Sequence, residues 1–274
     1  MYLPMNFPAR PRLPGLILDL DGTIYLGNEP IRGALETVAR LQGEGYRVVF
    51  ATNNLERRQD MTARLSRMGV AVQEDDILHA PLAMRILLEQ EVPGAKLFVI
   101  GLPCLRDQLA EAFALTDDPG QAQAVVVSFD DAFNFQQLVT AFRALRRGAR
   151  FFATNADPTW PTSQGELPDS GALIAALEVC SGRKLEGIAG KPSPWIGRAA
   201  LARLGLRPED TWIVGDSLAT DIGMGRDLGL TTVLVLAGVT SRSALQDSPW
   251  RPDHTLERLS DLPALLPKVQ APST

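Results

Sequence analysis

The chain alternates short apolar runs with segments in which apolar residues recur every three or four positions. Four of the runs are rich in Leu, Ile, Val or Phe and end at Gly, Asp, Asn or Thr: 16–18, 47–51, 211–214 and 232–236. Such runs predict strands that are buried on both faces of a sheet. The segments between them predict helices at 33–42, 57–68, 195–204 and 221–228. Strands that alternate with helices indicate an α/β fold with a doubly wound parallel sheet.

A second alternating set occupies the middle of the chain. It predicts strands at 96–100, 124–128 and 150–153, and helices at 135–146 and 172–180. Asp19 and Thr52 are 33 residues apart, which suits one strand–helix–strand unit, but Thr52 and Lys191 are 139 apart. The surplus of about a hundred residues is the size of a small domain. We therefore expect a lid-like domain at 81–184, inserted into a discontinuous core domain at 1–80 and 185–274.

Composition narrows the classes of protein. Of the 274 residues, 45% are hydrophobic and 22% charged, which indicates a globular chain. The net charge of −5 and the lack of a basic block disfavour nucleic-acid partners. No apolar run reaches the roughly 18 residues of a membrane span, and residues 1–15 do not resemble a secretory signal. The two cysteines exclude a disulfide framework, so we expect a cytoplasmic protein without a membrane partner.

Histidine is scarce, with only His79 and His254, so zinc sites and Ser-His-Asp triads are disfavoured. Acidic residues follow the first predicted strand instead, where Asp19 and Asp21 precede Gly22. Two carboxylates at one strand end suit a hard cation such as Mg²⁺, and the glycine permits a tight turn. Taken alone, this pattern is equally typical of an Asx-turn that closes a strand.

Three further polar clusters follow predicted strands or precede helices. Thr52 and Asn53 could hold phosphate oxygens or could cap a helix. Lys191 lies between Gly190 and Pro192, which suits a fixed positive charge but also a solvated helix start. Taken alone, each of these two clusters favours the structural interpretation. The third cluster is Asp216, which could complete a set of metal-binding oxygens, with Asp221 anchoring its loop or capping the next helix.

In chain order, Asp19 to Thr23, then Thr52, then Gly190-Lys191-Pro192, then Gly215 to Asp221 resemble the four motifs of the haloacid dehalogenase (HAD) superfamily. The insertion resembles the C2-type cap of that superfamily. The stretches 150–157, 181–184 and 190–195 resemble subfamily IIA, which includes NagD-type and p-nitrophenyl phosphatase-type enzymes. The resemblance runs from about Leu16 to Leu262 and implies a Rossmann-like core with an inserted α/β C2-type cap.

The resemblance also implies an activity, namely Mg²⁺-dependent hydrolysis of small phosphomonoesters through an aspartyl-phosphate. Asp19 would be the nucleophile, and Asp21 would be the general acid and then the base. The metal ligands would be Asp19, the backbone carbonyl of Asp21, and Asp216, with Asp221 ligating the metal or supporting its loop. The phosphate contacts would come from Thr52, the Asn53 backbone and Lys191, and Lys191 would also stabilise the nucleophile.

Two alternatives use the same kinds of residue. A non-enzymatic regulatory module that binds phosphate and Mg²⁺ would not need an acid at Asp21, and a dehalogenase would need neither Asp21 nor Asp216. The predicted partner is a small phosphorylated molecule, and the apolar cap strands are compatible with a homodimer through the cap. Within the cap, we expect 128–131 and 155–157 to face the site, although Asp130 and Asp157 better fit a helix-capping interpretation.

Overall fold

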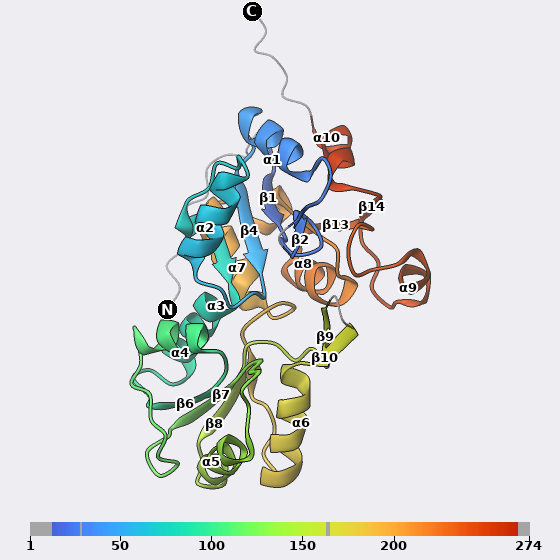
Figure 1. Ribbon diagram of the computed structural model, residues 1–274. Coiled ribbons are helices and arrows are strands. Elements are labelled where there is room, and N and C mark those ends of the chain that lie inside the picture. The colour runs from blue at the N-terminus through green and yellow to red at the C-terminus, as the bar shows by residue number, and fades with distance from the viewer. Residues whose placement is uncertain (1–12, 28, 163–164, 268–274) are drawn as a thin grey trace, which may run out of the picture. The chain divides into compact units, whose positions relative to one another are not determined.

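The computed structural model describes residues 13–267 except 28 and 163–164 (Figure 1). Residues 1–12 and 268–274 lie outside the described residues. Both segments belong to the predicted core domain, and the first contains most of residues 1–15, which were predicted not to form a secretory signal. The chain divides into two compact units. The first unit is Met1–Thr52, Arg58–Leu78 and Ile196–Thr274, and the second is Asn53–Arg57 and His79–Trp195. The second unit thus extends past the predicted insertion of 81–184 and includes Asn53 and Lys191.

The first unit is built on a six-stranded sheet in the order β14-β13-β12-β1-β4-β5. Its strands are β1 (Gly15–Leu18), β4 (Val48–Thr52), β5 (Ile77–His79), β12 (Thr211–Gly215), β13 (Thr231–Val235) and β14 (His254–Leu256). β1 pairs in parallel with both β4 and β12, so the chain winds outward from β1 in two directions. In such sheets, ligand sites lie beyond the carboxyl ends of the strands, at the point where the winding reverses.

Helices pack on both faces of this sheet. They are α1 (Ala34–Gly43), α2 (Arg58–Arg67), α7 (Pro194–Leu204), α8 (Gly223–Leu228), α9 (Arg242–Asp247) and α10 (Leu262–Leu265). On one face, Leu16 and Leu18 of β1 share a buried cluster with Val38 of α1 and Leu65 of α2. On the other face, α8 approaches β12 so closely that a Cβ on Gly225 would overlap the Ile213 side chain. The short strands β2 (Tyr25–Leu26) and β3 (Glu29–Pro30) form an antiparallel hairpin after β1.

The second unit contains a four-stranded parallel sheet in the order β11-β8-β7-β6. Its strands are β6 (Leu97–Ile100), β7 (Ala124–Val127), β8 (Arg150–Ala153) and β11 (Gly187–Ile188). Its helices are α3 (Ala80–Glu91), α4 (Pro103–Ala110), α5 (Phe135–Arg146) and α6 (Ser170–Ser181). The strands β9 (Thr159–Thr162) and β10 (Gly165–Pro168) pair as an antiparallel hairpin. A buried apolar cluster joins β7 and β8 to α5 and α6.

The predicted class is confirmed, since both units are α/β with parallel sheets. Each predicted strand is present within about two residues of its predicted ends. Within the described ranges, none of the helices combines the length and the apolar character that crossing a bilayer requires.

Candidate active site

Asp19 lies directly after β1, where it is buried. Its backbone N–H donates to the carbonyl of Val214, so the residue follows the line of the sheet into the loop. The hydroxyl of Thr23 donates to Oδ2 of Asp19 at 3.2 Å, across a turn in which Gly22 has a φ of 86°. A positive φ of this kind is easily adopted only by glycine. The turn therefore orients the carboxylate through Thr23.

Asp216 follows the neighbouring strand β12 and is also buried. Its Oδ2 accepts the backbone N–H of Val239 at 2.6 Å. A Cβ on either Gly22 or Gly238 would overlap the Asp216 carboxylate. Two backbone segments thus enclose this side chain at distances that only glycine allows.

Asp221 lies one turn further on, and its structure differs from the prediction of a helix at 221–228. A π-helical turn covers Leu218–Ile222, and α8 begins only at Gly223. Oδ2 of Asp221 accepts the backbone N–H of Ser217 at 3.1 Å, which holds the turn against the residue after Asp216. Single π-turns are frequent at functional sites, because they direct a side chain out of the regular helical path.

These three carboxylates form one cluster. One oxygen from each of Asp19, Asp216 and Asp221 lies within 4.8 Å of the others, and all three residues are buried. Like charges so close together repel one another strongly in a poorly solvated site. An all-oxygen donor set of carboxylates fits a hard divalent cation, which would offset the repulsion. The residues therefore suit a Mg²⁺ site.

Asp21 does not belong to this cluster, and its side chain is exposed. It forms a β-bridge with Tyr25, whose ring is buried and whose hydroxyl accepts a hydrogen bond from Arg64 at 3.0 Å. The Arg64 guanidinium also lies 4.7 Å from the centre of the Tyr25 ring. Burial raises the pKa of the Tyr25 hydroxyl well above its usual value, the negative charge of Asp21 raises it further, and Arg64 opposes both.

Thr52, the last residue of β4, is buried in the first unit, whereas Asn53 and Lys191 lie in the second. The Asn53 side chain is bonded twice to the backbone of Lys191: its Oδ1 accepts from N at 2.7 Å, and its Nδ2 donates to O at 3.0 Å. A Cβ on Gly190 would come within 2.5 Å of that same Asn53 amide. Asn53 therefore fixes the backbone on either side of the buried Lys191. The sequence predicted a phosphate contact from the Asn53 backbone or a helix cap, but not these bonds to Lys191.

The helix-capping interpretation of Asp130 and Asp157 is wrong, because Asn134 caps α5 and Asp169 caps α6. Asp130 instead supports the loop before α5. Its carboxylate accepts from the backbone of Ala132 and from the Gln137 side chain, both at 3.0 Å, near the start of α5. Asp157 accepts from Nδ2 of Asn155 at 3.0 Å, and the same nitrogen donates to Asp169 at 2.9 Å. Asn155 thus ties together the two ends of the β9–β10 segment.

Sequence reasoning missed three contributors to the first unit's site, namely Val239, Gly238 and the Tyr25–Arg64 pair. The signal for two of them was present, because Ala237-Gly238-Val239 directly follows the predicted strand 232–236. A glycine at a strand end can mark a close backbone approach, here to Asp216. The contact between Tyr25 and Arg64 spans 39 residues and has no local signature.

The sequence and fold of this chain are similar to those of proteins of known family. Residues 16–113 match the haloacid dehalogenase-like hydrolase family, and residues 188–262 match a HAD-hydrolase-like family. An acid sugar phosphatase of Staphylococcus saprophyticus is 33% identical over 90% of this chain and 95% of its own length. A 5'-nucleotidase of Bacillus subtilis, YutF, is 35% identical over 90% of this chain and 96% of its own length.

The solved structure of a p-nitrophenyl phosphatase from Archaeoglobus fulgidus superposes with a TM-score of 0.87 at 35% identity. It covers 93% of this chain and 100% of its own. Similarity in sequence and fold thus extends through both units, and all four sequence motifs lie within it. The chain therefore belongs to the haloacid dehalogenase-like hydrolases, and within them to subfamily IIA, the group of the NagD-type and p-nitrophenyl phosphatase-type enzymes.

Proposed function

We propose that this protein is a Mg²⁺-dependent phosphatase that hydrolyses small phosphomonoesters through an aspartyl-phosphate. The observation that carries the proposal is the buried cluster of Asp19, Asp216 and Asp221, whose oxygens lie within 4.8 Å of one another. Phosphoryl transfer depends chiefly on positioning and on neutralising charge, and this cluster can hold a divalent cation beside a carboxylate nucleophile.

In the first step, an oxygen of the Asp19 carboxylate attacks phosphorus, and the bond from phosphorus to the leaving oxygen breaks. Thr23 orients that carboxylate through its hydroxyl, which is bonded to Oδ2. A proton from the protonated Asp21 side chain goes to the leaving oxygen, so the product leaves as a neutral alcohol. Asp21 suits this task because its side chain is exposed and outside the metal cluster.

In the second step, water attacks phosphorus of the aspartyl-phosphate. Asp21, now a carboxylate, removes a proton from that water, and the bond from phosphorus to Asp19 breaks. Inorganic phosphate is released and both carboxyl groups return to their starting states. One residue thus acts as acid and then as base, as microscopic reversibility requires of a two-step hydrolysis.

The remaining groups supply charge and position. A Mg²⁺ ion held by Asp19, the Asp21 carbonyl and Asp216 would neutralise charge that develops on the phosphoryl oxygens. Asp221 holds the Asp216 loop through the Ser217 N–H. We assign Thr52 and the Asn53 backbone to the phosphate oxygens, and Lys191 to the phosphoryl charge.

The proposed substrate class is the one that is common to the names of the relatives. Their names describe an acid sugar phosphatase, a 5'-nucleotidase and a p-nitrophenyl phosphatase. The common element is a phosphate monoester on a small molecule, while the leaving groups differ. We therefore propose sugar phosphates and nucleoside monophosphates as the first substrates to test.

The test is release of inorganic phosphate from a panel of such esters, with Mg²⁺ and with a chelator. Asp19→Asn should abolish turnover because an amide cannot replace the attacking carboxylate. Asp227→Asn is the matched control, since Asp227 is an exposed residue of α8 in the same unit. Turnover that persists in Asp19→Asn or without metal would overturn the mechanism. Mg²⁺ binding without turnover of any ester would instead favour a regulatory binding module.

A further inference from the structure

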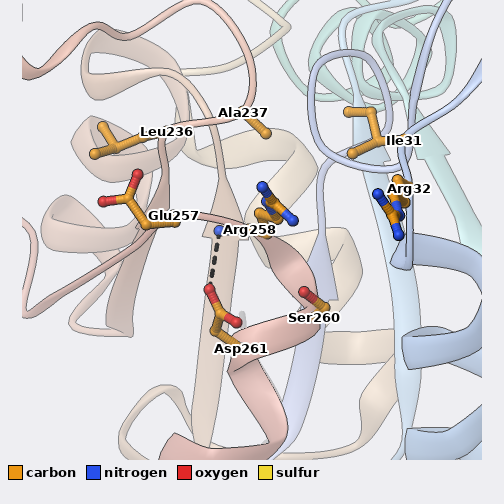
Figure 2. A pocket seen from close by; sticks show the side chains of 8 residues that line it. All are labelled: Ile31, Arg32, Leu236, Ala237, Glu257, Arg258, Ser260 and Asp261. Atoms are coloured by element: carbon orange, nitrogen blue, oxygen red, sulfur yellow. Dashed lines mark hydrogen bonds between the residues drawn. The ribbon is translucent and has the colours of Figure 1, made fainter.

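The first unit contains a hollow of about 520 Å³ beside the carboxyl ends of β13 and β14 (Figure 2). Its lining includes two exposed arginines, Arg32 and Arg258, and two exposed carboxylates, Glu257 and Asp261. The charges in this lining are therefore balanced, and they favour no particular class of ligand. A more specific arrangement lies in the second unit, around the loop Asn53–Arg57.

The loop Asn53–Arg57 follows β4 of the first unit along the chain, but it belongs to the second unit. Its first residue is the asparagine whose side chain bonds twice to the Lys191 backbone. A second attachment lies two residues further on, where Nε2 of Gln108 donates to the Leu55 carbonyl at 3.0 Å. These bonds attach the loop to the second unit at its first and third residues.

Gln108 is a half-buried residue of α4, and its side-chain amide is engaged on all sides. Besides the Leu55 carbonyl, its Nε2 donates to the Cys104 carbonyl at 2.9 Å. Carbonyl oxygens only accept, so the amide nitrogen faces them, and Oε1 faces Nε2 of the buried His79 at 2.8 Å. The His79 ring then carries its proton on Nε2, which agrees with its Nδ1 accepting the backbone N–H of Leu82. His79 thus holds the Gln108 amide in the orientation that lets it donate to Leu55.

The ion pairs of the loop contribute less to its attachment. The Arg57 guanidinium lies 3.1 Å from the Asp107 carboxylate and 3.6 Å from the Glu111 carboxylate. The side chains of these two acids are 64% and 61% exposed. Exposed pairs of this kind stabilise a structure little, because water and salt screen the attraction. The Gln108 amide is therefore the principal tie between the loop and α4.

We propose that Gln108 is a positioning residue for phosphate binding. It holds the Leu55 carbonyl, and it thereby sets the direction of the Asn53 backbone N–H two residues earlier. This role rests on the proposed function, which assigns that N–H to the phosphate oxygens. Hydrogen-bond donors stabilise phosphoryl charge most strongly when they are held in position before the substrate arrives. Gln108 supplies that rigidity without contacting the substrate, because its amide is bonded within the second unit.

Two nearly isosteric variants test the proposal. Gln108→Glu keeps an acceptor for His79 but lacks the amide donor to Leu55, and Gln108→Met lacks both functions without adding charge. Trypsin cleaves after arginine, so the rate of cleavage after Arg57 reports how often the loop detaches. We expect that rate to rise about fivefold in both variants, since one hydrogen bond of the loop is lost. The Kd for inorganic phosphate, measured by calorimetry with Mg²⁺ present, should also rise about fivefold.

Gln136→Glu is the matched control, because Gln136 is an exposed residue of α5 in the same unit and undergoes the same change of charge. It should leave the cleavage rate and the Kd for phosphate unchanged. The affinity for Mg²⁺ should be the same in all three variants and in the unaltered protein, because the proposed metal ligands lie in the first unit. Lost Mg²⁺ affinity in both Gln108 variants would indicate a general structural role instead.

The proposal is also overturned by an unchanged cleavage rate in both Gln108 variants, or by an unchanged Kd for phosphate despite faster cleavage. An effect confined to Gln108→Glu, or one shared by Gln136→Glu, would reflect added charge and would overturn it as well. If the unaltered protein binds no phosphate, the proposed function fails together with the role in phosphate binding. The cleavage rates then decide separately whether Gln108 holds the loop.

Discussion

In the first unit, the loops after β1 and β12 bring together Asp19, Asp216 and Asp221. In the second unit, the loops after β7 and β8 also carry buried polar side chains, but these are mostly neutral. Ser128 accepts from Thr154 at 2.6 Å, and Asn155 accepts from Ser170 at 2.6 Å. Both sets of loops follow strands of parallel sheets, so the architecture alone does not distinguish them.

The two groups of polar side chains differ in their balance of hydrogen-bond donors and acceptors. Hydroxyl and amide groups both donate and accept, so a neutral cluster can satisfy itself internally. Ionised carboxylates only accept, and three of them together need positive charge from outside the cluster. A strand-end cluster with an excess of one polarity is thus a candidate ligand site, whereas a balanced one is a structural element.

After the loss of the nucleophile Asp19, the largest predicted effect concerns Asp21, the exposed carboxylate outside the cluster. Asp21→Asn should reduce turnover by about 10²–10⁴-fold, because the amide cannot transfer the proton. Affinity for Mg²⁺ should hardly change, since the backbone carbonyl remains. Phosphate-release kinetics and a Mg²⁺ titration of the same preparation measure both quantities. Unchanged turnover would remove Asp21 from the mechanism, and lost Mg²⁺ affinity would join it to the cluster.

The next effect concerns the glycines that enclose Asp216. A methyl group in Gly238→Ala would overlap that carboxylate, so Mg²⁺ affinity should fall about 10–100-fold, as it does when the support of a metal ligand is disturbed. Gly43→Ala is the matched control, because a Cβ on Gly43 meets nothing within 4 Å. Titration calorimetry compares the two variants. Equal Mg²⁺ affinities would show that the Asp216 carboxylate can shift without weakening metal binding.

Much of this first unit could be predicted from the sequence. The apolar run Leu16–Leu18 predicts β1. The positions of Asp19, Asp216 and Asp221 after or near predicted strands predict that their side chains lie close together, as they do. Strand ends of a parallel sheet meet at one edge, so sequence order and strand type suffice for that expectation. Local pattern and this rule of topology thus predict that the acids meet, while the resemblance to the HAD motifs was needed to prefer a functional role over a turn or a helix cap.

Other features depend on contacts that no local pattern encodes. The bonds from Asn53 to the Lys191 backbone span 138 residues, and they exist only in the folded chain. The β9–β10 hairpin was not predicted from the sequence. It contains proline and glycine, which are typical of loops and turns. The π-turn that displaces the start of α8 depends on the Asp221 bond to Ser217, which a helical period does not reveal.

The hydrogen-bonded cluster around Asn155 in the second unit gives a third prediction, which concerns stability. Asn155→Ala removes the nearer of two acceptors of the buried Ser170 hydroxyl, the other being Asp169, and it removes the donor shared by Asp157 and Asp169. The free energy of unfolding should fall by about 1–3 kcal/mol. Gln136→Ala, on the exposed side of α5, should change it by less than about 0.5 kcal/mol. Urea unfolding measures both, and a Mg²⁺-dependent loss for Asn155→Ala would contradict a purely structural role.

The smallest predicted effect is on how the free energy of unfolding depends on pH, and it differs between Tyr25 in the first unit and Asn155 in the second. Because burial and Asp21 raise the pKa of Tyr25 in the folded chain, this hydroxyl stays protonated there while it ionises in the unfolded chain near pH 10. Above pH 10 the unfolded state therefore binds fewer protons, and Tyr25 lowers stability by up to about 1.4 kcal/mol per pH unit.

Tyr25→Phe should lose about 1 kcal/mol below pH 9, because the bond from Arg64 disappears. That deficit should shrink as the pH rises above 10, since phenylalanine does not titrate. Asn155→Ala should instead run parallel to the unaltered protein, because no group in that substitution ionises at this pH. Urea unfolding between pH 8 and about 11 compares the three proteins. Parallel curves for Tyr25→Phe would mean that the hydroxyl beside Asp21 ionises as readily in the folded state as in the unfolded one.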